Sequence, residues 1–376
     1  MRPPPGFSDG DKVWKLNRCI YGLKQSANEW YALFARFLTT KGFTASTFDP
    51  CMFVHAKHDC YISLYVDDIA IYSADNPYLK SLIKDLKTAF EITDLGEASF
   101  LLGLHITYTP DRLRLTQERY IDTVLKRFDM ENSRTVSTPL PKGIQLKSGT
   151  EDERIEDPSI YQSIIGSLMY VTTGTRPDLS YTISFLSQFS ACPTEQHLKA
   201  AKHVLKYLNH TKTIGLDFPY RNTKAIDVYV DADYAACLDS RRSYSGYTVL
   251  FNGSCISWCS KKQKSVSVST TEAEYVAMSL ATRQIQWLTF GLHDVRLDMP
   301  IAMHADNTGA NFLARNPQLN VRTKHIDVHF HKTREELQRG TFTLLQVASQ
   351  DNLADICTKI LAKPAHELLM DRLGCR

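Results

Sequence analysis

The segment YISLYVDDIAIYS places two adjacent carboxylates, Asp67 and Asp68, between two apolar runs. The runs, Tyr61–Val66 and Ile69–Tyr72, are rich in β-branched and aromatic residues, so they predict a β-hairpin with the acidic pair at its bend. Neighbouring carboxylates repel each other, and a divalent cation relieves that repulsion. Such a pair is suited to hold Mg²⁺ against a triphosphate during nucleotidyl transfer. The alternative is an exposed acidic turn, because Asp is a favoured turn residue.

The bulk composition is that of an ordinary globular protein long enough for two or three domains. Of its 376 residues, 43% are hydrophobic and 23% are charged, and the net charge is +3. This charge alone does not predict a nucleic-acid partner, but basic residues cluster at 261–264, at Arg241-Arg242 and over 199–212. Any one of these clusters, taken alone, is more typical of solvated surface.

The cysteines and the hydropathy predict an intracellular protein without a membrane partner. Nine cysteines occur without a CxxC pair, which indicates neither a disulfide framework nor a zinc site. No apolar run has the length needed to span a bilayer, and no signal peptide is recognised at the first residues.

Hydrophobic periodicity in the first part of the chain predicts an α+β unit followed by a helical block. The expected elements are a helix over 27–41, the hairpin, a helix starting at Asn76-Pro77, strands over 99–108 and 112–116, and a helix over 118–128. Residues 131–160 lack periodicity and are rich in Ser, Thr, Pro and charged residues, so they are the best linker candidate. Helices are expected around 161–171, 177–190 and 195–209.

From about residue 214 the pattern predicts a mixture of short strands and helices. Strands are expected at 226–231, 245–251, 255–260, 301–305 and 341–347, and helices at 271–292, 307–314, 325–338 and 352–358. Asn252-Gly253 between the second and third strands is a strong hairpin-turn signal. The whole chain is therefore expected to combine α+β and α/β architecture.

Four acidic residues of this last region fall at the ends of predicted elements. Asp231 closes a strand, Glu274 lies in the first turns of the long helix, Asp306 ends the next strand and Asp355 lies in the late helix. Carboxylates arranged in this way can converge on one point, where divalent cations would stabilise them. Two Mg²⁺ ions there would activate a water and stabilise the leaving oxygen of an in-line phosphodiester cleavage. A single one of these residues, such as Asp231, is otherwise a helix cap or an exposed acid.

Several longer strings recur in one specific order along the chain. They include LNRCIYGLKQSANEWY (16–31), LYVDDIAIYS (64–73), YQSIIGSLMYVTTGTRPDLSY (161–181), ISWCSKKQKSVSVSTTEAEY (256–275) and NLADICTK (352–359). Over nearly all of its length the chain resembles the C-terminal part of a copia-type LTR-retrotransposon Pol polyprotein. The resemblance implies a truncated reverse-transcriptase palm and thumb over 1–130, a linker and helical connection over 131–213, and an RNase H-like mixed-sheet domain over 214–376.

The resemblance also implies roles for the acidic residues. Asp67 and Asp68 match the paired carboxylates of the polymerase palm, and Asp231, Glu274, Asp306 and Asp355 match the carboxylates of RNase H. The implied cofactor is Mg²⁺ or Mn²⁺, bound by these same residues. Glu274 is preferred to Glu272 because the family-like spacing Glu-x-x-Ala begins at Glu274, and Asp233 is the alternative to Asp231.

Nucleic-acid contacts are expected from basic and polar residues in two of the matching strings. They are Lys24, Gln25, Lys261, Lys262 and Lys264. Lys24 would contact phosphate as a point charge, in a segment that resembles the one facing template or incoming nucleotide. His325, His329 and His331 are expected to meet phosphate or transfer protons, with a plain surface helix as the equal alternative.

The family role implied by the resemblance is that of an RNA-directed DNA polymerase with RNase H, acting on template-primer and RNA–DNA hybrid. Family members carry a third palm aspartate and the fingers upstream of a PPPGF-like loop, and this sequence begins at that loop, so we expect it alone to be at best a very poor polymerase. Other Pol and Gag segments are expected partners, in cytoplasmic virus-like particles and in the nucleus. The alternatives are a catalytically silent remnant that only binds nucleic acid, and a fragment of a longer active polyprotein.

Overall fold

The computed structural model describes residues 2–3, 6–7, 13–17, 19–20, 22–74, 76–220, 225–316 and 327–376, without the side chains of 327–331. Their contacts divide the chain into one unit of residues 1–97 with 290–297 and a second of residues 98–289 with 298–376. The second unit contains residues on both sides of 131–213, because a strand at 216–219 pairs with a strand at 112–116. The expected domain boundaries at 130/131 and 213/214 stay predictions. Within the described ranges, no helix is both long and apolar enough to cross a membrane.

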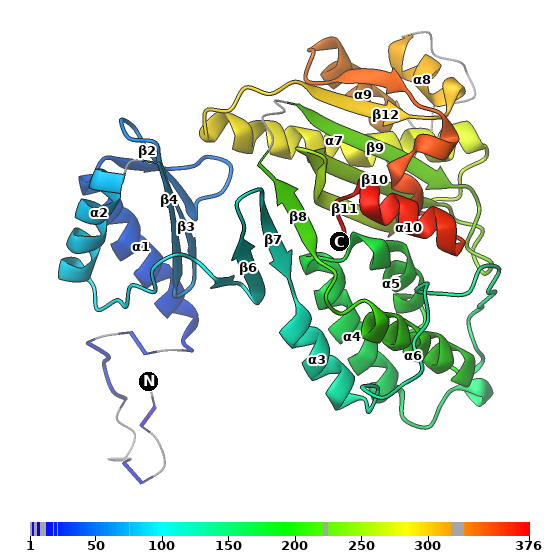
Figure 1. Ribbon diagram of the computed structural model, residues 1–376, viewed down its shortest axis with the longest axis horizontal. Coiled ribbons are helices and arrows are strands. Elements are labelled where there is room, and N and C mark those ends of the chain that lie inside the picture. Colours follow the sequence, from blue (N-terminus) through cyan, green and yellow to red (C-terminus); the bar gives the residue numbers. More distant parts are fainter. Residues whose placement is uncertain are drawn as a thin grey trace. The chain divides into compact units, whose positions relative to one another are not determined.

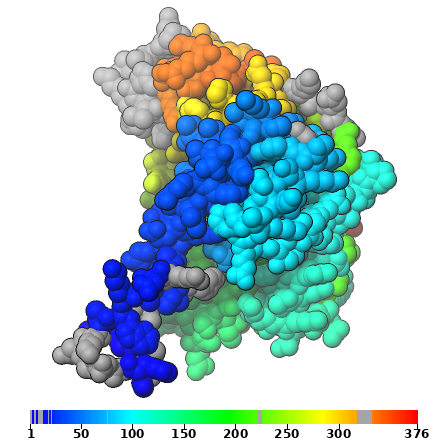
Figure 2. All heavy atoms as spheres, turned by 90° about the vertical axis from the view of Figure 1, so that its left-hand side faces the viewer, coloured from blue at the N-terminus to red at the C-terminus, as the bar shows by residue number. Residues whose placement is uncertain are grey.

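The first unit packs two helices against an antiparallel sheet. The sheet has the order β1 (Phe43–Ala45), β2 (Met52–His55), β3 (Cys60–Tyr65) and β4 (Asp68–Ser73), and the helices are α1 (Lys24–Thr40) and α2 (Asn76–Ala89). Their apolar faces meet in a core that includes Phe34, Phe53 and Leu82. The predicted helices and hairpin are confirmed, whereas the short strands β1 and β2 were not predicted. In Figure 2 the described residues before α1, in dark blue, project away from the rest of this unit.

A second antiparallel sheet opens the second unit. Its order is β5 (Phe100–Leu101), β6 (Leu104–Tyr108), β7 (Arg112–Thr116) and β8 (Leu216–Pro219). The prediction of one continuous strand over 99–108 is wrong, because Leu102 and Gly103 adopt positive φ angles of 51° and 79° and turn the chain. A glycine meets this conformation without a steric penalty.

The helices of the second unit share one core. They are α3 (Glu118–Arg127), α4 (Pro158–Gly174), η2 (Pro177–Leu179), α5 (Ser180–Ser187) and α6 (Glu195–His210). The candidate linker between α3 and α4 is irregular, as predicted, with a short 3₁₀ helix η1 (Glu151–Glu153). It is nevertheless packed, since Leu140 and Leu146 are buried in the helical core. These two leucines therefore anchor the segment to the helical core.

The last part of the chain contains a five-stranded mixed sheet. Its order is β11 (Ser254–Lys262), β10 (Tyr244–Phe251), β9 (Ile226–Asp233), β12 (Ile301–Ala305) and β13 (Thr343–Gln346). β9, β10 and β11 form an antiparallel meander, and β12 and β13 run parallel to β9. Asn252 and Gly253 form the predicted hairpin turn, with φ angles of 54° and 79°. The expected mixed sheet of an RNase H-like domain is confirmed.

Helices surround this sheet. They are α7 (Thr270–Asp294), α8 (Thr308–Arg315), α9 (Asp327–Gln338), η4 (Ser349–Asp351), η5 (Leu353–Cys357) and α10 (Lys363–Arg372). Figure 1 shows α7 passing behind the sheet and α10 in front of it. The helix predicted over 352–358 is the 3₁₀ helix η5, and α10 was not predicted.

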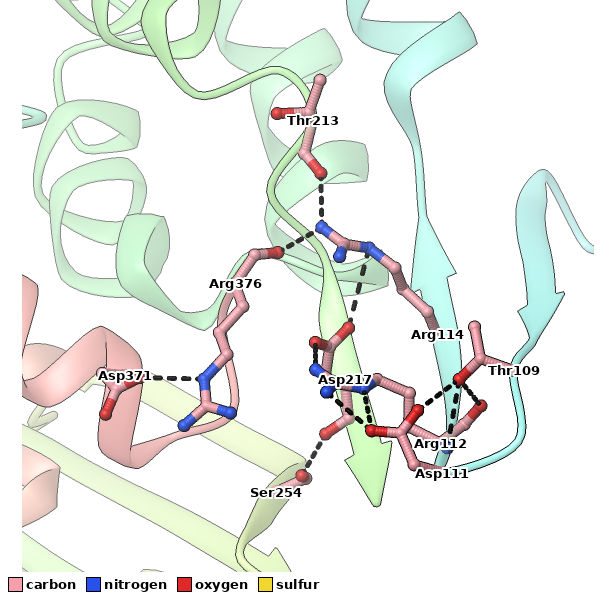
Figure 3. A network of polar contacts seen from close by, with 9 residues as sticks. All are labelled: Thr109, Asp111, Arg112, Arg114, Thr213, Asp217, Ser254, Asp371 and Arg376. Carbon is pink, nitrogen blue, oxygen red and sulfur yellow. Dashed lines mark hydrogen bonds and ion pairs between the residues drawn. The ribbon is translucent and has the colours of Figure 1, made fainter. Parts of the chain in front are cut away.

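An ion-pair network ties β7 and β8 to the last residues of the chain (Figure 3). Asp217 of β8 is almost fully buried and accepts a 2.9 Å hydrogen bond from Arg112 Nη1 of β7. Arg114 Nη2 donates to the carbonyl oxygens of Thr213, at 2.9 Å, and of Arg376, at 2.6 Å. These contacts help to hold β8 beside β7, although 99 residues (117–215) lie between the two strands in the sequence.

Candidate metal centre

Three of the predicted carboxylates meet at the carboxyl ends of the neighbouring strands β9 and β12. Asp231 lies near the end of β9, and Asp306 follows β12, whose last residue, Ala305, lies opposite Val230 of β9. Glu274 approaches from the second turn of α7. One carboxylate oxygen from each of Asp231, Glu274 and Asp306 lies within 4.8 Å of the others. The predicted convergence of strand and helix carboxylates is therefore observed for these three.

Glu272 and Glu274, the two alternatives at the start of α7, have different contacts. Glu272 Oε2 accepts a 2.8 Å hydrogen bond from the amide of Val268, and its own amide donates to Ser269 Oγ at 3.1 Å. These contacts close the first turn of the helix. Glu274 instead joins the carboxylate group, and its Oε2 is buried without a hydrogen-bond partner. An unpartnered buried oxygen beside two other carboxylates fits a divalent-cation site.

Asp233, the alternative to Asp231, is not part of this group. It lies two residues further along β9 and is half-buried. Burial raises its pKa to about 6, Lys359 opposes this change, and the charge of Asp231 adds to it. Asp231 is 1% exposed and receives a hydrogen bond from the hydroxyl of Thr358.

Asp355 is linked to Asp231 by an ion pair that each of them forms with Lys359, a residue that was not predicted from the sequence. Its Oδ1 lies 2.7 Å from Lys359 Nζ, and the same ammonium lies 3.2 Å from Asp231 Oδ2. Burial lowers the pKa of Lys359, but Asp231 and Asp355 outweigh burial and raise it, so the side chain is charged. The available signal was the string NLADICTK, in which Lys359 follows Asp355 by four residues, the spacing at which helical side chains meet.

The position of η5 depends on close contact with β9 and β10. Asn352 accepts a hydrogen bond from the amide of Ala354 and donates one to the carbonyl of Val230, at 3.2 and 2.9 Å. Gly246 of β10 pairs with Asp231, and a Cβ atom added there would lie 2.7 Å from Thr358 Cγ2. Only glycine permits this approach, which brings Thr358 and Lys359 beside Asp231.

Burial and mutual repulsion raise the pKa values of two carboxyl groups of the centre when no cation is bound. Burial foremost, then the charges of Asp231 and Asp306, raise the pKa of Glu274 to about 9. Burial and Asp231 also raise the pKa of Asp355 to about 6, against the effect of Lys359. Glu274 is therefore protonated at neutral pH in the cation-free protein, and a divalent cation would compete with that proton.

We expect the cation-free protein to lose stability as pH rises from about 5 to 9. The pKa of Glu274 is higher in the folded chain than in the unfolded one, so its contribution is fully present below about 4.5 and is lost as pH approaches 9. Thermal unfolding in EDTA across this range measures the effect. Glu274→Gln, which mimics the protonated side chain, should flatten the pH dependence, and an unchanged slope in this variant would contradict the assignment.

The polymerase-type pair lies at the tip of the predicted hairpin. Tyr65 of β3 pairs with Asp68 of β4, and Val66 and Asp67 form the two-residue turn, with Val66 at φ 55°. Trp30 Nε1 of α1 donates a 2.8 Å hydrogen bond to the carbonyl of Val66 and fixes the turn to the helix. Both carboxylates are exposed. Among the described residues they belong to no group of three or more potential metal ligands.

The predicted nucleic-acid contacts have different environments. Lys24, Gln25, Lys261 and Lys264 are exposed, whereas Lys262 is half-buried and donates a 2.7 Å hydrogen bond to Gln188 Oε1. The predictions for three histidines fall outside the part of the chain whose side chains are described. These are His325, His329 and His331.

Comparison with known proteins identifies the lineage. Residues 1–142 match the family model described as reverse transcriptase (RNA-dependent DNA polymerase). All of the chain aligns with the Retrovirus-related Pol polyprotein from transposon RE1 of Arabidopsis thaliana, at 38% identity over 26% of that protein. The corresponding protein from transposon TNT 1-94 of Nicotiana tabacum is 35% identical, over 29% of its length. The chain belongs to the copia-type retrotransposon Pol polyproteins. It spans between a quarter and a third of these two relatives.

A solved structure is similar to part of this Pol chain. It is an RNase H1 isolated from compost by a metagenomic approach, which is 17% identical and matches 37% of the Pol chain and 96% of its own, with a TM-score of 0.29. The RNase H-like organisation of the Pol chain itself follows from its strand order and from the parallel pairing of β12 with β9.

Proposed function

We propose that the mixed-sheet part of this Pol chain is a ribonuclease H that cleaves the RNA strand of an RNA–DNA hybrid. The observation that supports it most is the convergence of Asp231, Glu274 and Asp306, with the buried Glu274 Oε2 left without a partner. Unpaired buried carboxylates are costly, and a divalent cation offsets that cost. Within the reverse-transcriptase family this chemistry would serve reverse transcription.

The carboxylates of the centre would bind two divalent ions. Asp231, Glu274 and Asp306 would hold a Mg²⁺ or Mn²⁺ ion, and Asp231 with Asp355 would hold a second. The ions would lower the pKa of the attacking water and stabilise charge on the leaving oxygen. The carboxylates orient this chemistry because each is fixed by the end of a strand or a packed helical turn.

Basic side chains beside the sheet would position the hybrid. Lys261 on β11 and Lys264 after it are exposed, as are Arg241 and Arg242. Their charges would contact phosphates without reading sequence, so binding should weaken steeply with salt. We infer an accessory role for Lys262, whose ammonium is already engaged by Gln188.

We infer a separate role for the exposed pair Asp67 and Asp68 as ligands of a polymerase ion in the palm. Lys24 and Gln25, at the start of α1, would face template or nucleotide. These residues lie in the part of the chain that matches the reverse-transcriptase family model. Other Pol and Gag segments are the proposed protein partners.

Incubation of the purified chain with end-labelled RNA–DNA hybrid and Mg²⁺ tests the nuclease. We expect cleavage of the RNA strand only, and its loss in Asp306→Asn, which keeps the shape of the side chain but removes its charge. Duplex RNA and duplex DNA are the substrate controls. Equal cleavage by both proteins, or none by either, would sink the proposal. Salt-sensitive binding of the hybrid without turnover would favour the alternative of a silent nucleic-acid-binding remnant.

A further inference from the structure

Lys359 places its positive charge where a divalent ion would be expected. Its ammonium lies 2.7 Å from Asp355 Oδ1 and 3.2 Å from Asp231 Oδ2. Asp231 is also one of the three carboxylates that converge with Glu274 and Asp306. Asp231 thus belongs both to the group of three carboxylates and to the ion pair with Lys359.

This contact differs from an ordinary surface pair between a lysine and the acid four residues before it. Such exposed pairs contribute little to stability. Here the ammonium also reaches Asp231, whose side chain is almost completely buried, while the lysine side chain itself is 36% exposed. The pair therefore compensates a buried charge and keeps access to solvent.

An ammonium and a divalent ion cannot occupy this position together. Mg²⁺ binds carboxylate oxygens at about 2.0–2.1 Å, so an ion shared by Asp231 and Asp355 would occupy the space now taken by the Lys359 ammonium. The like charges would also repel each other at this separation. One of the two has to leave.

We propose that Lys359 is a built-in counter-ion for the Asp231–Asp355 half of the centre and sets the order in which divalent ions bind. The first ion binds at Asp231, Glu274 and Asp306. The second binds between Asp231 and Asp355 only when the ammonium of Lys359 moves away. The inference rests on the proposed function, because it takes the carboxylates to be a centre for divalent ions.

The position of Lys359 permits that movement. It follows η5 by two residues, and its four-carbon side chain is flexible and partly exposed. The first ion would itself favour the displacement, since it neutralises Asp231 and repels the ammonium. Lys359 therefore competes with the second ion for the place between Asp231 and Asp355.

Titration calorimetry of the full chain with Mn²⁺ tests this order. Wild-type protein should bind one ion tightly and a second more weakly. Lys359→Met keeps the length of the side chain without its charge and should tighten the second site about tenfold, with the first changed less than about twofold. Lys363→Met is the matched control, because it removes the same charge from an exposed lysine paired with Glu367 at 3.8 Å, and it should bind like the wild type.

Three calorimetric results would overturn the inference. They are an unchanged second site in Lys359→Met, equal weakening of both sites, and no binding of Mn²⁺ by the wild type. The titrations contain no hybrid, so ordered ion binding without RNA cleavage would refute the proposed nuclease and leave the ion order supported.

A measurement on wild-type protein covers the case in which Lys359→Met fails to fold. The ¹⁵N resonance of the Lys359 ammonium can be assigned by its loss in Lys359→Arg. It should persist through the first equivalent of Mg²⁺ and move to the position of a free lysine during the second. Displacement by the first equivalent, or persistence at saturation, would contradict the proposed order.

Discussion

Asp231→Asn should reduce cleavage of the RNA strand by more than about 10³-fold while leaving the fold in place. Asp231 is the carboxylate common to the whole centre: it converges with Glu274 and Asp306 and is paired with Lys359. Asparagine keeps the shape and an oxygen for the Thr358 hydroxyl, but it removes the charge that would bind both ions. Rates on labelled hybrid at saturating Mg²⁺ measure the loss, and circular dichroism checks the fold.

Asp233→Asn is the matched control for this prediction. Asp233 lies on the same strand and is half-buried, but it is outside the converging group. We expect its variant to retain activity within about tenfold of the wild type. A loss in Asp233→Asn as large as that in Asp231→Asn, or full activity of the latter, would show that the ligand on β9 has been misassigned.

Local pattern was sufficient to predict the elements that carry the carboxylates. The alternation around Asp67 and Asp68 predicted their hairpin, and Asn252-Gly253 predicted the turn between β10 and β11. Regular periodicity also predicted α7, which places Glu274 in its second turn. These signals are strong because backbone conformation and one-sided burial act on neighbouring residues.

Elements defined by distant contacts were not predictable in the same way. β8 is four residues long and is recognised as a strand through its pairing with β7. The segment before α4 lacks periodicity, yet Leu140 and Leu146 are buried because helices that follow in sequence cover them. Short or irregular segments carry too few residues for a pattern, so tertiary packing decides their structure.

The same limit applied to the centre itself. Strand ends predicted the meeting of Asp231 and Asp306, because β9 and β12 are parallel neighbours. Lys359 gave only the signal of an ordinary lysine four residues after an acid. Its contact with Asp231 depends on how closely η5 approaches β10 at Gly246, which is a property of three-dimensional packing.

Arg176→Met should lower the free energy of unfolding by about 3–5 kcal/mol. The side chain is fully buried, and its Nε and Nη2 donate to the two carboxylate oxygens of Asp178 at 2.9 and 2.8 Å. It also donates to the carbonyl and the hydroxyl of Thr211, and Tyr207 donates to Asp178 at 2.7 Å. Removing the guanidinium leaves the Asp178 carboxylate buried without its counter-ion.

Urea unfolding at several pH values separates this charge effect from lost packing. Burial raises the pKa of Asp178, but Arg176 outweighs burial and lowers it, so the pair's favourable contribution is present above about pH 4 and is lost as pH falls further. Without Arg176 the carboxyl can protonate at higher pH, so the difference between variant and wild type should shrink between pH 7 and 4. Arg154→Met is the control, since Arg154 forms only a 3.6 Å pair with the exposed Glu151, and it should cost less than about 1 kcal/mol. A penalty for Arg176→Met that is equally small, or one that stays constant across pH, would mean that the buried pair does not hold the helical core together through its charge.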